Sequence, residues 1–169
     1  MYARTGDKFA ETKYAQTDVN STNGVVELAF SSDNSILAIG DYTGTVTLYN
    51  VPQPVIKKQG LSPLPVYYGE MELMAGPIDI GMPLQSLSIG PVSGNLVVGG
   101  GDQADGIIAL YDAAADFDQI RNWTTTNVTL GVTFAPDESL VAASDNTGKV
   151  TLFNIDGTTN TTLTPIGTV

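Results

Sequence analysis

The chain has 169 residues and a formal net charge of −11, and it contains no cysteine and no histidine. Binding to nucleic acids or to anionic lipids needs clustered cations, and the 7 Lys and Arg residues form no such cluster, so the composition excludes both roles. The absence of cysteine excludes disulfides, thiolate zinc sites and iron–sulfur sites. No apolar stretch reaches the roughly 20 residues that a membrane helix requires.

The first 22 residues are polar, and residues 8–14, KFAETKY, are their one strand-like piece. Residues 22–24, Thr-Asn-Gly, then predict a turn into the apolar part of the chain. No secretory signal opens the sequence, which slightly favours a cytoplasmic location and leaves an extracellular one open.

Residues 26–51 predict three short strands joined by tight turns. Leu28 and Phe30 alternate at period two, which is typical of a strand with one buried face. Residues 36–40 form an apolar run that suits a strand buried on both faces, although so short a run does not exclude a helix. Val46 and Leu48 alternate with Thr and Tyr in the third strand. Gly44, in the turn before it, is expected to take the left-handed conformation that closes a hairpin.

Residues 52–83 are rich in Pro and Met. Within them, residues 66–73, VYYGEMEL, predict an outer strand, and the remainder predicts a loop or insertion of roughly 20 residues, a length that is usually functional or disordered. Its apolar content argues against disorder. Two alternatives follow: the insertion folds down over its own sheet, or it exposes a Met and Tyr contact surface, since Met adapts well to partners.

The pattern then recurs twice. Residues 84–112 repeat it loosely, with a longer hairpin at 99–106, and residues 122–129 predict the outer strand that follows. Residues 130–155 align with 26–51 at a shift of 104 residues without a gap, and eleven of the 26 positions are identical. The Thr-rich tail, 158–169, predicts a last outer strand. Internal repeats of this kind define the fold before any other signal.

The stretches FSSDN, ILAIGD and TGTVTLYN, and their later copy FAPDESLVAASDNTGKVTLFN, resemble the blade motif of WD-repeat β-propellers. The resemblance implies an all-β chain of about three blades, each a four-stranded antiparallel sheet. The expected divisions are an N-terminal segment at 1–22 that supplies an outer strand, blade 1 at 23–83 with the insertion at 52–83, blade 2 at 84–129, and blade 3 at 130–169.

Two features depart from the family pattern. The Trp-Asp pair is replaced by Tyr49-Asn50, Tyr111-Asp112 and Phe153-Asn154, and the usual Gly-His pair is absent, so the His–Asp network of such blades cannot form. Propellers close with about four to eight blades. Three blades are therefore interpreted as part of a longer protein, with a ring completed by further copies as the second interpretation.

No constellation of residues predicts catalysis, a cofactor or a metal. Gly99–Ala104 matches a dinucleotide-binding pattern, but it joins two expected strands, where the pattern has no meaning. A serine-type triad lacks its usual histidine base. Carboxylates at 102 and 105, or at 112, 116 and 118, have oxygens suited to Ca²⁺, but their spacing is not that of an EF-hand and Asp is common in turns. A propeller enzyme of the lactonase or quinoprotein type would need residues from further blades.

The resemblance implies a non-catalytic platform that binds other proteins or further copies of its own blades. The expected contact residues lie on the insertion and on the hairpins: Tyr67, Tyr68, Met71, Met74, Tyr42, Asp102, Asp105 and Asn146. Trp123 is interpreted as a packing residue. The alternative function is a structural or surface protein of an extracellular layer, sheath or virion, glycosylated at the sequons of Asn20, Asn122, Asn127 and Asn160.

Overall fold

The computed structural model describes residues 23–53, 70–103 and 105–155 with their side chains. It gives the backbone of five further strands: β1 (Tyr2–Thr5), β2 (Lys8–Lys13), β6 (Val55–Lys57), β7 (Leu64–Val66) and β16 (Leu163–Thr168). In the described parts the chain is built of strands, with one short 3₁₀ helix, η1 (Ala113–Ala115). None of the described helical residues forms a helix of the length and apolar character needed to cross a membrane.

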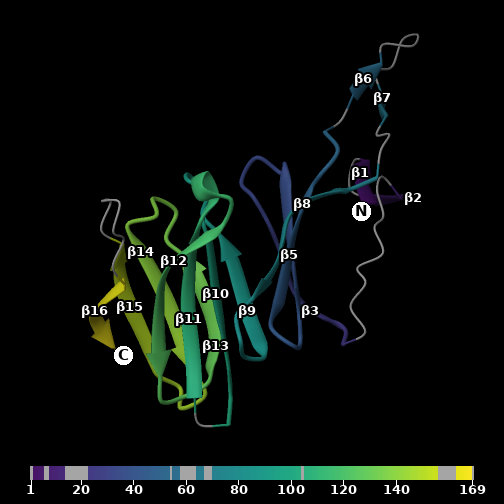
Figure 1. Ribbon diagram of the computed structural model, residues 1–169. Coiled ribbons are helices and arrows are strands. Elements are labelled where there is room, and N and C mark those ends of the chain that lie inside the picture. The colour runs from purple at the N-terminus through teal and green to yellow at the C-terminus, as the bar shows by residue number, and fades with distance from the viewer. Residues whose placement is uncertain are drawn as a thin grey trace.

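Three four-stranded antiparallel sheets follow one another along the chain and stand side by side as blades (Figure 1). Blade 1 consists, from its inner to its outer edge, of β3 (Val25–Phe30), β4 (Ile36–Asp41), β5 (Thr45–Asn50) and β8 (Glu72–Asp79). Blade 2 consists of β9 (Leu84–Ile89), β10 (Leu96–Asp102), β11 (Asp105–Asp112) and β12 (Asp118–Thr125). Blade 3 consists of β13 (Thr129–Phe134), β14 (Leu140–Asp145), β15 (Val150–Ile155) and β16. The expected all-β fold of four-stranded blades is confirmed.

The middle strands of each blade carry apolar side chains on both faces of the sheet. We call the face toward the preceding blade the leading face and the opposite one the trailing face; at both junctions the trailing face of one blade packs on the leading face of the next. In blade 2 the leading face carries Leu87, Ile89, Leu96, Val98 and Tyr111. The trailing face of blade 1, which these side chains cover, carries Ala38, Val46 and Leu48.

The junction between blades 2 and 3 is built in the same way. The trailing face of blade 2 carries Val97, Ile108 and Leu110. The leading face of blade 3 carries Val132, Phe134, Val141, Ala143 and Phe153. Burying Val, Leu and Phe side chains contributes about 1.5–3 kcal/mol each, so these two junctions are the main source of stability in the described residues.

The outer strands differ in part from the sequence-based expectation. Blade 1 takes β8, at 72–79, and not residues 66–73, so that prediction is wrong. The reason is packing: Ala75 and Ile78 lie opposite Leu48 and Val46 and extend the core between blades 1 and 2. Pro77 fits there because an outer strand has a free edge, where a missing N–H costs no ladder bond.

Of the predictions for the other outer strands and for the N-terminal strand, some are confirmed and others are wrong. Strand β16, at 163–168, pairs with β15, which confirms the predicted outer strand of blade 3. Strand β12 spans 118–125 rather than the expected 122–129: its pairing with β11 begins at Asp118, and Thr129 is instead buried at the start of β13. Strand β2 forms as expected, but it pairs with β1 in a sheet of its own rather than with a blade.

The insertion contains a two-stranded sheet, in which β6 pairs with β7. Residues 54, 58–63 and 67–69 lie outside the described residues. Whether the insertion covers its own blade or forms a contact surface stays a prediction.

Candidate functional site

The hairpins β4–β5, β10–β11 and β14–β15 all turn at the same end of the blades, the lower end in Figure 1. We call this the hairpin end. Four of the residues expected to contact partners lie on it: Tyr42, Asp102, Asp105 and Asn146. Two equivalent backbone bonds hold the first and third hairpins: Tyr42 N–H donates to the carbonyl of Gly24 at 3.3 Å, and Asn146 N–H donates to that of Val128 at 3.0 Å.

An aspartate shapes each of these two turns from inside. Asp41 Oδ1 accepts from the amide and hydroxyl of Thr43, at 3.0 and 2.7 Å, and Asp145 Oδ1 accepts from those of Thr147, at 2.9 and 2.6 Å. The Thr147 hydroxyl bond is the main reason that the pKa of Asp145 is lowered, since hydrogen bonds to the carboxylate favour its charged form. These aspartates are therefore committed to turn geometry.

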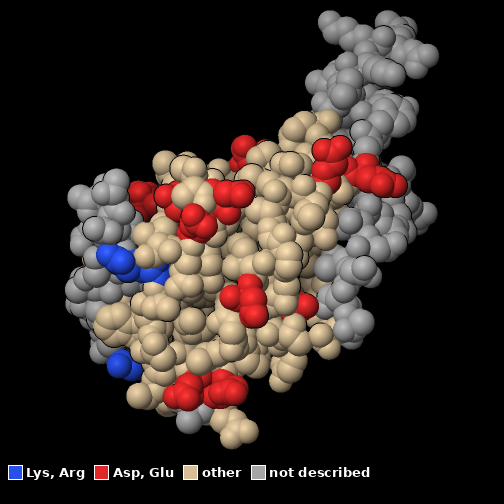
Figure 2. Space-filling view, in the orientation of Figure 1, with Lys and Arg blue, Asp and Glu red and all other residues tan. Residues whose placement is uncertain are grey.

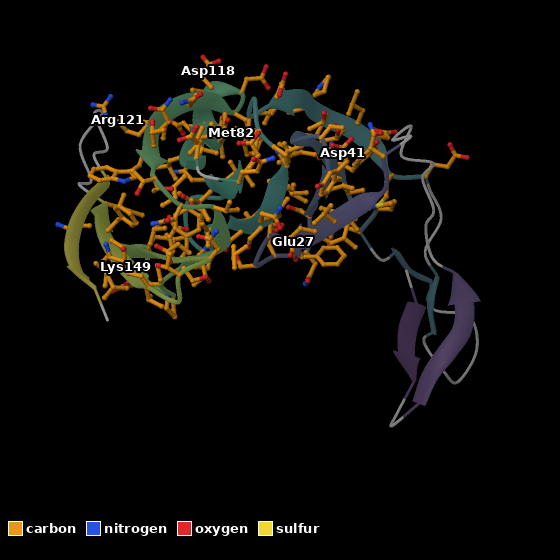
Figure 3. The ribbon with its side chains drawn as sticks, turned by 90° about the horizontal axis from the view of Figure 1, so that it is seen from below. Glu27, Asp41, Met82, Asp118, Arg121 and Lys149 are labelled. Atoms are coloured by element: carbon orange, nitrogen blue, oxygen red, sulfur yellow. The ribbon has the colours of Figure 1, made fainter. Side chains whose placement is uncertain are left out.

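The left-handed conformation predicted for Gly44 is confirmed, and its copy Gly148 shares it. Gly44 has φ 94° and Gly148 has φ 84°, the left-handed region that suits glycine. At Gly44 a side chain would also collide with the backbone carbonyl of Met82. Seen from below, Met82 lies between Asp41 of blade 1 and Asp118 of blade 2 (Figure 3).

The hairpins of blades 1 and 2 are joined into one surface by residues 80–83. Ile80 N–H donates to the carbonyl of Gly44 at 3.0 Å, and Gly101 N–H donates to that of Pro83 at 2.9 Å. The first two hairpins of the hairpin end thus form one hydrogen-bonded framework and are not independent loops.

Outward-pointing groups on this framework combine an aromatic ring with carboxylates. Tyr42 is 58% exposed, and Asp102 and Asp105 are exposed and face each other directly in the ladder. Like charges that are direct cross-strand neighbours destabilise a sheet. Of the described cations, Arg121 lies on β12, away from the hairpins, whereas Lys149 is the last residue of the β14–β15 turn and belongs to the hairpin end of blade 3. Figure 2 shows carboxylates in several patches of the visible face and cations on one side.

The two methionines expected to contact partners are not part of the hairpin end. Strand β8 begins opposite Asn50 and ends opposite Thr45, so its first residues lie away from the hairpin turns. Met74 is exposed on this strand, and Met71 packs against the cluster that contains Tyr49. Tyr67 and Tyr68 lie outside the described residues. The contact role of all eight residues stays a prediction.

At the opposite end, neighbouring blades are joined by polar bonds between their turns. Glu138 Oε1 accepts from the amides of Val92 and Ser93, at 2.5 and 2.9 Å, and Ser32 donates its hydroxyl to the carbonyl of Pro91 at 2.7 Å. The turn 91–93 of blade 2 is therefore held by both of its neighbours. This end contributes rigidity to the described blades.

A groove of about 290 Å³ runs between the outer part of blade 2 and blade 3. Trp123 lines it and meets Phe153 edge to face, with ring centroids 5.6 Å apart. The interpretation of Trp123 as a packing residue is therefore incomplete, because the ring also forms a groove wall. Thr124, Thr151 and Lys149 add polar groups. Sequence reasoning missed this groove because it depends on the spacing between two blades.

The remaining sequence candidates have ordinary structural settings. Asp112 caps η1 by accepting from the amide of Ala114 at 2.9 Å, and the described residues contain no group of three potential ligands that could hold a metal ion. Asn122 is exposed on β12, and Asn127 lies in the turn after it. Asn20 and Asn160 lie outside the described residues, and use of the sequons stays a prediction.

Comparison with known proteins locates the fold. No protein-family model matches the chain, and no curated protein matches it. Among solved structures, the crystal structure of the RRP9 WD40 repeats is similar, with a TM-score of 0.62 and 14% sequence identity. The match covers 89% of this chain and 40% of that one. At this identity the likeness shows the fold, so the three sheets are propeller blades of the WD40 type, and the chain spans less than half the length of the structure it matches.

Proposed function

We propose that the chain is a non-catalytic scaffold that binds another protein through its hairpin end. One observation carries the proposal: three consecutive blades present their hairpins at the same end, and hydrogen bonds join the first two hairpins through residues 80–83. A rigid surface of this kind binds without first ordering its own loops, which lowers the cost of association. The likeness to WD40 repeats supports it, since that fold generally serves as an interaction scaffold.

The chemistry of the exposed groups defines the kind of partner. Asp102 and Asp105 repel each other across the ladder, and a cationic side chain from a partner would relieve that repulsion. Tyr42 offers an aromatic ring of the type that is enriched in interface hot spots. The partner is therefore a protein segment that combines Lys or Arg with an apolar contact, and complementary charge would speed its association.

Site-specific photo-crosslinking tests this proposal. A photoreactive phenylalanine analogue in place of Tyr42 should capture a protein that the same analogue does not capture at Val92, which is 75% exposed at the opposite end. The captured protein should then bind Tyr42→Ala, or the pair Asp102→Asn and Asp105→Asn, about 10-fold more weakly, while Val92→Ser leaves its affinity unchanged. Equal capture at positions 42 and 92, or full affinity in the hairpin variants, would contradict the proposal.

A further inference from the structure

The leading face of blade 1 is open along its inner strand. Phe30 is 45% exposed, whereas its copy Phe134 is 8% exposed, and Leu28 is 55% exposed, whereas its copy Val132 is 7% exposed. On the same face, Leu37 and Ile39 of β4 and Tyr49 of β5 are buried. The free part is therefore β3.

The trailing face of blade 3 is less covered than the trailing face of blade 1. Its side chains Ala142, Val150 and Leu152 are only partly buried. They are the same residue types as their copies in blade 1, which are fully buried under blade 2: Ala38, Val46 and Leu48. The same apolar side chains are thus fully covered by a neighbouring blade in blade 1 and only partly covered in blade 3.

Both open faces are halves of an interface that the molecule already makes twice. In each internal junction the inner strand of one blade lies against the inner strand and the next strand of the blade before it: β9 against β3 and β4, and β13 against β9 and β10. The open strands, β3 and β14, are the members of the next such pair. They lie at opposite ends of the stack, so a single copy does not bring them together (Figure 1).

We infer that a second copy of this chain covers these faces, with β14 of one copy against β3 of the other. The interface is head-to-tail, and two of them related by a two-fold axis close a ring of six blades. Six lies within the range of about four to eight blades in which propellers close. This inference does not depend on the proposed partner, which binds at the hairpin end.

A glycine marks each internal junction and is missing from the open face. A side chain at Gly40 would collide with Leu84, and one at Gly99 would collide with Thr129 and Val132. The equivalent position of blade 3 is Ser144, which lies opposite Val150 as Gly40 lies opposite Val46. The serine keeps the two copies slightly further apart than the internal blades, so the association is weaker than the internal junctions and reversible.

Sedimentation velocity across a range of concentrations tests the inference. The full chain should shift from one 17.7 kDa copy to the mass of two copies as concentration rises to about 100 µM. Phe30→Asp and Leu152→Asp should each remain a single copy, and Ser144→Gly should bring the transition to lower concentration. Val26→Asp is the matched control, because Val26 and its copy Leu130 are both exposed even though Leu130 belongs to a packed blade.

Mixing distinguishes the head-to-tail interface from any other. A chain with Phe30→Asp keeps its open β14, and a chain with Leu152→Asp keeps its open β3, so an equimolar mixture should form a heterodimer that neither variant forms alone. Circular dichroism confirms that each variant is folded before it is scored.

Three results would overturn the inference. These are a wild-type chain that stays a single copy throughout, a mixture that fails to associate, and wild-type species that grow beyond two copies. The first result would leave the open faces to blades of a longer chain. Photo-crosslinking at Tyr42 would be unaffected by any of them, so failure here and failure of the proposed function are distinguishable.

Discussion

Residues 26–51 and 130–155 are one structural unit in two surroundings. Both form three strands with the same turn aspartates and left-handed glycines, yet Phe134 is buried against blade 2 while Phe30 is open. The residue types do not account for the difference, because Phe occupies both positions. What differs is the neighbour, so the same sequence pattern has different energetic weight in the two blades.

The largest expected effect is the contrast between the two phenylalanines. Phe134→Ala should lower the free energy of unfolding by about 3–5 kcal/mol, because it leaves a cavity in the junction of blades 2 and 3. Phe30→Ala should lower it by less than about 1 kcal/mol, since exposed substitutions have small effects. Chemical denaturation of dilute protein measures both, and equal losses would show that a neighbouring blade does not decide burial.

A second contrast concerns close approach between blades. Gly40→Ala adds a methyl group that meets Leu84, so we expect a loss of about 1–3 kcal/mol from overpacking. Its copy is Ser144, and Ser144→Ala should change stability by less than about 0.5 kcal/mol. Thermal unfolding of the two variants compares them. A neutral Gly40→Ala would mean that blades 1 and 2 are packed less closely than described.

A third contrast concerns the polar bonds between turns. Glu138 accepts two amide bonds from blade 2, whereas its copy Asn34 has a different role, as its carbonyl accepts from the side chain of Gln53 at 3.1 Å. Glu138→Ala should cost about 1 kcal/mol, with faster amide exchange at Val92 and Ser93. Asn34→Ala should leave exchange at those two amides unchanged. Equal exchange in both variants would contradict a role for Glu138 in joining the blades.

The smallest expected effect is a difference between the pKa values of two turn aspartates, Asp33 and its copy Asp137. The Ser31 hydroxyl, and after it that of Ser35, lowers the pKa of Asp33 to about 2, and the pKa of its copy Asp137 is lowered by Ser139. Position 135 is Ala, so Asp137 has no counterpart of the Ser31 bond. Ser31→Ala should therefore raise the pKa of Asp33 toward its usual range, which carboxyl NMR titration measures. An unchanged titration would show that the Ser31 bond is not formed in solution.

The sign of the corresponding pH dependence follows from these shifts. A carboxylate whose pKa is lower in the folded state stabilises the fold above its ordinary pKa, and that stabilisation is lost as pH falls through the folded value. For Asp33 the window runs from its usual 3.8 down to about 2. Asp33→Asn should flatten the decline of stability in this window relative to the wild-type chain.

Local patterns were sufficient to predict the inner three strands of each blade and their turns. Period-two alternation located Leu28 and Phe30 on one face, and Gly44 was recognisable because only one residue type suits its turn. The outer strand of blade 1 was misplaced because residues 66–73 and 72–79 both have strand-like patterns, and contact with Leu48 and Val46 selects the second.

In the candidate site, too, local features were predictable from the sequence and features that depend on neighbouring blades were not. The hairpin residues Tyr42, Asp102, Asp105 and Asn146 were accessible to sequence reasoning because hairpin turns are local. The groove beside Trp123 and the open strand β3 were not, because they depend on which blades are neighbours. Repetition in a sequence reveals equivalent positions, but it does not reveal which of them are covered.

Thiol labelling at two equivalent positions tests the central claim most directly, since the chain has no cysteine of its own. Leu28→Cys and Val132→Cys introduce single thiols at copies that are 55% and 7% exposed. We expect fast labelling at position 28 in dilute protein, slowing as concentration rises and a second copy covers β3, with slow labelling at position 132 throughout. Equal labelling rates at the two positions in dilute protein would contradict the claim that the neighbouring blade decides which copy is open.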